Sequence, residues 1–130
     1  MNWEKSSEHG VYLLEGSKFP KGYKEVDQKQ YFHLCFIEDR KSNTVWLKCG
    51  ITCNPKERMK AHYHMYGIVC LLWVSPIFSK YTAGKVEDEF KDFTRNHLAW
   101  EYIRNDRFIM PDGITTIEVR VRKTYTIHLG

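Results

Sequence analysis

The chain contains 130 residues, of which 42% are hydrophobic and 15% aromatic, and its formal net charge is +4. A chain of this length can bury one compact core but is too short for two ordinary domains. The mild positive charge permits a polyanionic partner, yet it falls short of the strongly basic composition of dedicated nucleic-acid readers. The longest apolar run, residues 68–74, is much shorter than the roughly 20 residues that a membrane-spanning helix needs.

The N-terminus has no basic segment followed by a continuous apolar run, so it does not resemble a secretion signal. The 4 cysteines lie in or beside apolar runs and lack the spacing of a disulfide framework. We therefore expect reduced thiols and a cytoplasmic protein that makes no membrane contact.

The first part of the chain, residues 1–28, is polar and rich in Gly and Lys, with one short apolar run at 11–14. This pattern predicts an N-terminal arm that carries one strand. Residues 29–130 are expected to form the folded domain. Its first two apolar runs, 31–37 and 45–49, flank a charged and polar turn, which predicts a β-hairpin.

A helix start is well marked after this hairpin. Asn54 can cap the helix, Pro55 suits its first position, and Glu57 stands where a capping-box carboxylate reaches back to the cap amide. We expect the helix to run to about Tyr66, where Gly67 offers a left-handed exit.

Three further elements are expected downstream. Residues 68–76 predict a central strand, and residues 79–97 predict a second helix. Residues 98–113 are irregular and aromatic, whereas residues 116–128 alternate between apolar and polar side chains, which predicts one half-buried strand broken only at Lys123. The buried face of the second helix is expected to comprise Ala83, Val86, Phe90 and Phe93.

The segment from Lys48 to Thr52 reads as a buried strand that ends in a glycine turn and feeds the capped helix. Arg58 and His62 are four residues apart on that helix, so they project from one face. A guanidinium fork beside an imidazole is suited to a phosphate, although a solvated surface pair has the same spacing.

These residues resemble the GIY-YIG nuclease superfamily, and more narrowly its branch whose second motif reads Lys-apolar-Gly. The resemblance covers about residues 31–108. It implies an α/β (α+β) fold in which a small antiparallel three-stranded central sheet is flanked by helices, here with an added N-terminal arm and C-terminal strand. The residues that carry it are Tyr31-Phe32-His33-Leu34, Lys48-Cys49-Gly50-Ile51-Thr52, Asn54-Pro55, Arg58 and Glu87.

The resemblance also implies an activity, the hydrolysis of phosphodiester bonds in DNA with one Mg²⁺ or Mn²⁺ ion. By position, Arg58 would bind the scissile phosphate, His62 would be the histidine that follows it, and Glu87 would be the metal ligand. Helical geometry does not separate Glu87 from Glu89, and the family spacing selects Glu87. A carboxylate is a chemically sensible ligand because Mg²⁺ prefers oxygen.

The general base that the resemblance implies is either Tyr31 or His33, since the first motif lacks its glycine and allows two registers. Lys48 would assist by lowering the pKa of a tyrosine, or would contact phosphate itself. The segment Asp106-Arg107-Phe108 resembles the Glu-Trp-Phe that closes the domain in this branch, so Phe108 is expected in the core.

Arg120, Arg122 and the neighbouring Lys123 lie on or near the polar side of the last predicted strand. They would extend a nucleic-acid-binding surface through sequence-independent phosphate contacts, or they form an ordinary solvated strand face.

Three alternatives compete with a nuclease. A zinc site from Cys49, Cys53, His62 and His64 is disfavoured because the two histidines diverge on a helix. A thiol nucleophile at Cys53 lacks a legible His/Asp partner. The strongest alternative is an inactive module of the same fold that binds DNA, RNA or a protein partner, and a homodimer is compatible with either function. A small catalytic unit of this kind fits a phage or mobile-element protein.

Overall fold

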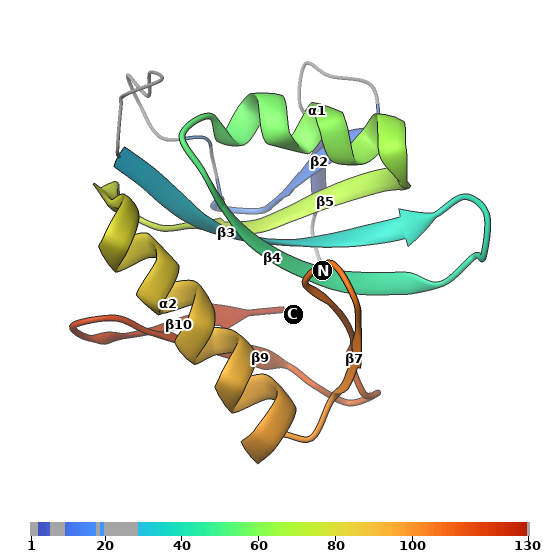
Figure 1. Ribbon diagram of the computed structural model, residues 1–130. Helices are drawn as coiled ribbons and strands as arrows, with labels where there is room; N and C mark the ends of the chain where they lie inside the picture. Colours follow the sequence, from blue (N-terminus) through green and yellow to red (C-terminus); the bar gives the residue numbers. More distant parts are fainter. Residues whose placement is uncertain (1–2, 6–9, 18, 20–28, 130) are drawn as a thin grey trace.

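The structure is a computed structural model that describes residues 3–5, 10–17, 19 and 29–129. Its centre is a mixed eight-stranded sheet, and a separate two-stranded sheet lies beside it (Figure 1). In spatial order the main path is β1 (Trp3–Lys5), β2 (Val11–Leu14), β5 (Gly67–Val74), β3 (Lys29–Asp39), β4 (Val45–Thr52), β8 (Arg107–Ile109) and β7 (Glu101–Ile103), with β6 (Phe78–Ser79) paired to β3.

Two helices pack on opposite faces of this sheet, α1 (Pro55–Met65) and α2 (Lys80–Asp92) (Figure 1). A π-helical turn, η1 (Phe93–His97), continues α2 to the end predicted for the second helix. The small sheet pairs β9 (Thr116–Arg120) with β10 (Thr124–His128), and β9 contacts α2.

The predicted α+β class with flanking helices is confirmed. The central sheet is larger than the three strands that were predicted, since it has eight. The antiparallel trio β5, β3 and β4 does lie at the centre. On one side β2 adds in parallel to β5, and on the other β8 and β7 add to β4. The strands β7 and β8 have three residues each, too few to show a strand period within the aromatic segment 98–113.

The single C-terminal strand predicted over residues 116–128 is wrong, because this segment folds back as the β9–β10 hairpin. The chain turns at residues 121–123, where the Val121 N–H donates to the Lys123 carbonyl at 3.0 Å. Both arms place apolar side chains at alternate positions, so the alternation continues through the turn. The lysine that interrupts the pattern marks the turn, not a tolerated strand edge.

The N-terminal strand at residues 11–14 is confirmed as β2. It is part of the main sheet, where Val11 pairs with Val69 and is almost fully buried. Residues 20–28 lie outside the described residues, so the division between arm and domain at residue 28 stays a prediction.

The start of α1 follows its sequence signals, with one difference. The Asn54 side chain accepts from the Glu57 N–H at 3.2 Å, and Pro55 occupies the first turn. The Asn54 N–H donates to Thr52 Oγ1 at 3.1 Å, so the cap amide does not rely on Glu57. Gly67 begins β5, where any Cβ would collide with the backbone of Glu38.

Two cores lie on the two faces of the sheet because successive side chains of β3 alternate. Cys35 and Ile37 pack with Met59 on the α1 side. Phe32 and Leu34 pack with the buried face of α2 on the other side, where the β9–β10 hairpin completes the layer. Each core therefore fixes one helix relative to the same central strand.

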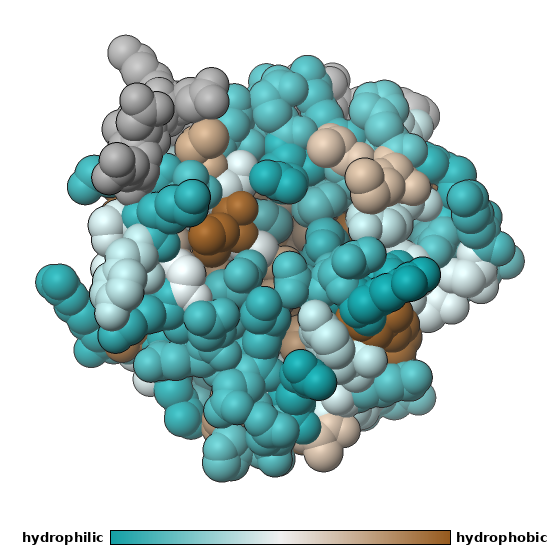
Figure 2. Space-filling model, in the orientation of Figure 1, coloured by the Kyte–Doolittle hydropathy of each residue, from teal (hydrophilic) through white to brown (hydrophobic). Residues whose placement is uncertain are grey.

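The face shown in Figure 2 is largely hydrophilic, with apolar residues in small separate patches. Within the residues that the structure describes, no helix is both long and apolar enough to cross a membrane.

Phe108 is fully buried, as predicted, and packs edge-on against Phe90 and Tyr102. We expect Phe108→Ala to lower the free energy of unfolding by about 3–5 kcal/mol, since it removes a large side chain from a filled core. Urea unfolding checks this. Tyr81→Ala, at an aromatic residue that is 72% exposed, is the control and should change stability by no more than about 0.5 kcal/mol. Equal losses in both variants would contradict the core assignment.

Candidate active site at the open edge of β4

A cavity of about 210 Å³ lies at the edge of β4, beyond the point where β8 stops pairing. The strand β8 pairs only with Leu47 and Lys48, so the C-terminal half of β4 has no neighbouring strand on this side among the described residues. The residues that line the cavity are His33, Lys48, Cys49, Gly50, Ile51, Arg58, His62, Glu87 and Asp106.

These side chains come from both sides of the sheet. Arg58 and His62 belong to α1, which covers one face, and Glu87 belongs to α2, which covers the other. They meet only because the strand edge between them is open. The site thus lies at the edge of the sheet, and its residues come from several helices and strands.

Gly50 makes this meeting possible. A Cβ at residue 50 would lie 3.1 Å from His33 Nε2 and 3.9 Å from Glu87 Oε2. The first separation is tighter than ordinary van der Waals contact, so any larger residue would push the imidazole away. The absence of a side chain at residue 50 therefore leaves room for the His33 imidazole and the Glu87 carboxylate to approach the strand.

Lys48 lines the cavity, but a hydrogen bond within the protein restrains its ammonium group. Its side chain is largely buried, and Nζ donates to the Asn105 carbonyl at 2.6 Å. Burial lowers the pKa of Lys48, although nearby Cys35 and Asp106 act in the opposite direction. The ammonium also lies 5.9 Å from the centre of the Tyr66 ring.

His33 and His62 are buried side by side, with exposed fractions of 1% and 5% and ring centres 5.9 Å apart. Burial first, and then repulsion from His62, Arg58 and Lys48, lowers the pKa of His33 well below its usual value. Burial, followed by the charges of Lys48 and Arg58, lowers the pKa of His62 to about 3. Both imidazoles are therefore neutral at pH 7.

One nitrogen of each ring, His33 Nδ1 and His62 Nε2, is buried without a hydrogen-bond partner among the described residues. Such atoms are uncommon in native proteins because losing water without replacement costs roughly 1–3 kcal/mol per group.

The carboxylates of the site are tied to one lysine. Lys91 Nζ lies 3.6 Å from Glu87 Oε1 and 3.0 Å from Asp106 Oδ1. Burial raises the pKa of Glu87, and the Lys91 charge opposes this shift. Burial alone would lower the pKa of Lys91, but its hydrogen bond to Asp106 and the charge of Glu87 raise it.

The cavity brings together His33, Lys48, Arg58, His62 and Glu87 of the predicted catalytic set. Tyr31 is buried and does not line the cavity.

The arginines of the last predicted strand lie elsewhere. Arg120 is 3.9 Å from Glu118 and stacks 4.4 Å from the centre of the Phe93 ring, beside a different cavity. Arg122 lies exposed in the β9–β10 turn. These two arginines are therefore separate from the site around Glu87.

The zinc set considered from sequence does not come together. Cys49 packs in the core on the α2 side, whereas His64 is exposed on α1. Within the described residues, the group whose ligand atoms lie close enough to share an ion is His33, Cys35 and His62. The sequence could have indicated part of this group, because residues two apart on a strand, such as His33 and Cys35, project from the same face.

Asp106 and Lys91 are two further residues of the site that sequence reasoning did not assign to it. The resemblance placed Asp106 in the closing segment, but its contact with a helix residue depends on the β7–β8 hairpin. Lys91 follows Glu87 by one helical turn, a spacing that already favours an ion pair.

The chain matches no protein-family model, no curated protein and no solved structure. Membership of the GIY-YIG superfamily therefore stays a prediction from the residues quoted above.

The buried neutral imidazoles predict a pH-dependent stability. Below pH 6.5 the imidazole of His62 is protonated in the unfolded chain, whereas in the folded protein it stays neutral down to about pH 3. The free energy of unfolding should therefore fall with decreasing pH. The loss should approach about 1.4 kcal/mol per pH unit for each such histidine. Urea unfolding in EDTA, from neutrality to about pH 5, measures the slope.

His62→Gln should reduce this slope, because it removes one of the titrating groups. His64→Gln replaces an exposed imidazole on the same helix and should retain the wild-type slope. If His62→Gln titrates like the wild type, the imidazole at residue 62 is not held neutral in the folded state.

Proposed function

We propose that this protein is a metal-dependent endonuclease of the GIY-YIG type, which hydrolyses phosphodiester bonds in DNA. One observation carries the proposal: Arg58, His33 and Glu87 converge on one cavity from opposite faces of the sheet. A binding surface alone gives no reason for a half-buried carboxylate to be aimed at the same small cavity as an arginine.

Phosphate binding is assigned to Arg58. Its side chain is exposed at the cavity, and its guanidinium can donate two parallel hydrogen bonds to phosphate oxygens. Neutral His62 beneath it can donate one further hydrogen bond from a ring N–H. The Lys48 ammonium already donates to the Asn105 carbonyl, so we assign it no direct contact with the phosphate. Lys48 contributes through its positive charge.

The donors at the cavity fit a hard divalent cation. Glu87 offers a carboxylate whose raised pKa reflects incomplete compensation of its charge, and Asp106 lines the same cavity. These oxygen donors would hold Mg²⁺ or Mn²⁺ in competition with Lys91, which pairs with both carboxylates. A bound ion would polarise the phosphate and stabilise the charge that develops on the leaving oxygen.

Of the two candidate bases, His33 is favoured over Tyr31 because it lines the cavity. Its imidazole stays neutral at working pH and so can accept a proton from water. The depressed pKa makes it a weak base in the free protein, and the negative charge of an incoming phosphodiester would raise its basicity. Lys48 then acts as a neighbouring cation and not as the partner of a tyrosine.

The alternative is an inactive module of this fold that binds nucleic acid or a protein partner. The contacts of Lys91 favour this alternative, since its ammonium pairs with both Glu87 and Asp106 and occupies the place of a metal ion. Lys48 is likewise committed to Asn105. In this reading Arg58 binds phosphate and no bond is broken.

Cleavage of supercoiled plasmid separates these functions. With Mg²⁺ or Mn²⁺ the wild type should cut, and EDTA should abolish cutting. Glu87→Gln and Arg58→Ala should each lose about a hundredfold or more in rate, because each removes a charge that acts in the transition state. Circular dichroism confirms that the variants are folded.

Glu89→Gln is the matched control, since Glu89 is an exposed glutamate on the same helix and should leave the rate unchanged. A wild type that binds plasmid without cutting it, with binding weakened by Arg58→Ala, would establish the inactive module.

The salt dependence of DNA binding tests the wider footprint. Each phosphate contact contributes about 0.9 to the slope of log K against log salt, so Arg58→Ala should lower the slope by about that amount. If Arg120 and Arg122 extend the surface, the variant Arg120→Ala/Arg122→Ala should lower it by up to about twice as much. Lys41→Ala, at an exposed lysine of the β3–β4 turn, is the control. An unchanged slope in the double variant would remove both arginines from the footprint.

A further inference from the structure

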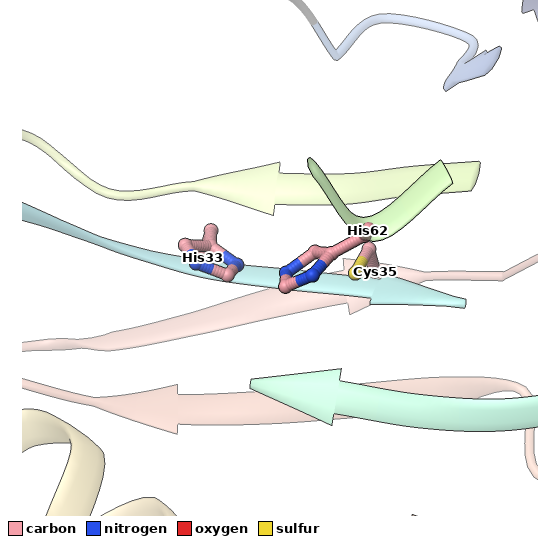
Figure 3. Close-up of side chains that lie close together, drawn as sticks. All are labelled: His33, Cys35 and His62. Atoms are coloured by element: carbon pink, nitrogen blue, oxygen red, sulfur yellow. The ribbon is translucent and has the colours of Figure 1, made fainter. Parts of the chain in front are cut away.

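The cluster of His33, Cys35 and His62 is separate from the carboxylates of the proposed nuclease site. His33 and Cys35 project from one face of β3, and His62 comes down from α1 beside them (Figure 3). One potential ligand atom from each residue lies within 4.8 Å of the other two. Three ligands from two elements thus meet at one point of the core.

Two ring nitrogens of this cluster are buried without a partner in the part of the chain that the structure describes. His33 Nδ1 and His62 Nε2 have no hydrogen-bond partner among the described residues. Cys35 is fully buried, and its Sγ makes a long 3.8 Å contact with the Lys48 carbonyl. A core that needed only to be filled would gain stability from apolar side chains at these positions.

We propose that His33, Cys35 and His62 bind a single thiophilic transition-metal ion, such as Zn²⁺ or Cu⁺. Imidazole nitrogen and thiolate sulfur are the ligands that such ions prefer, whereas Mg²⁺ and Mn²⁺ prefer oxygen. On binding, the Cys35 thiol loses its proton to solvent and forms a sulfur–metal bond, so no oxidant or reductant is consumed.

The spacing sets the geometry. The ligands of a tetrahedral Zn²⁺ lie about 3.5 Å apart, given metal–ligand bonds of about 2.0–2.3 Å. The cluster must therefore contract by about an ångström, which rotation of the imidazole rings can supply. The neighbouring cavity is lined by His33 and His62, so it provides both an entry path and room for a water as fourth ligand.

The charges around the cluster limit which ion it holds well. Lys48 and Arg58 place positive charge beside both histidines, while the Glu87 carboxylate, which lines the same cavity, is paired with Lys91. A thiolate with Cu⁺ is neutral, whereas a thiolate with Zn²⁺ keeps one positive charge. We therefore expect Cu⁺ to bind more tightly than Zn²⁺, and Mg²⁺ not to bind at this cluster.

This inference does not depend on the proposed nuclease activity, because it rests on the cluster alone. The two proposals do interact. An ion held by both histidines would take the lone pair that His33 needs as a base. A thiophilic ion is then expected to inhibit cleavage that Mg²⁺ supports.

Metal titration of the reduced protein without DNA tests the site. Zn²⁺ and Cu⁺ are each titrated in competition with a chromogenic chelator, and the wild type should bind one ion per chain. Cys35→Ser and His62→Gln should each weaken binding by about tenfold or more. Cys70→Ser, at a half-buried cysteine outside the cluster, should bind like the wild type.

A Co²⁺ titration of the wild type gives a readout that needs no variant, since a thiolate ligand produces intense charge-transfer absorption in the near ultraviolet. The proposal is overturned if bound Co²⁺ lacks this absorption, or if Cys35→Ser binds Zn²⁺ and Cu⁺ as tightly as the wild type. Because no nucleic acid is present, these results are distinguishable from failure of the nuclease proposal.

Discussion

Main-chain pairing between β3 and β4 sets His33 opposite Gly50 and Cys35 opposite Lys48. Side chains alternate along a strand, so all of these positions share the face that α1 covers. If β3 slipped by one residue, His33 and Cys35 would turn toward the α2 side, while Gly50 and Lys48 would still face α1. The cavity, the buried histidines and the cluster with Cys35 thus depend on one register, which the apolar side chains of both faces hold in place.

The same arrangement gathers uncompensated polar groups in the core. Two neutral imidazoles lie beside the cations of Lys48 and Arg58, while Glu87 is balanced by Lys91. The two buried imidazoles do not stabilise the fold as apolar residues of the same size would. Such costs are common where a protein must hold a ligand, because the ligand supplies the missing partner.

Local signals accounted for much of the fold. Asn54 and Pro55 predicted the start of α1, and the apolar runs predicted the central strands. The strands β7 and β8 escaped detection because short strands are defined by their partners, and the β9–β10 turn was hidden by a continuous alternation. Of the residues that line the cavity, Arg58 and Glu87 had been singled out by the resemblance to the GIY-YIG superfamily. The meeting of Cys35 with His33 and His62 was not foreseeable, because nothing local indicates that α1 places His62 beside Cys35.

The exposed edge of β4 has a consequence for association between chains. A bare strand edge offers unpaired N–H and C=O groups to any passing strand, and proteins protect such edges with charge. Here Arg58 and Glu87 flank the unpaired half of β4, beside a glycine that gives a second strand little to pack against. The charges of Arg58 and Glu87 therefore also protect this edge against pairing with a strand of another molecule.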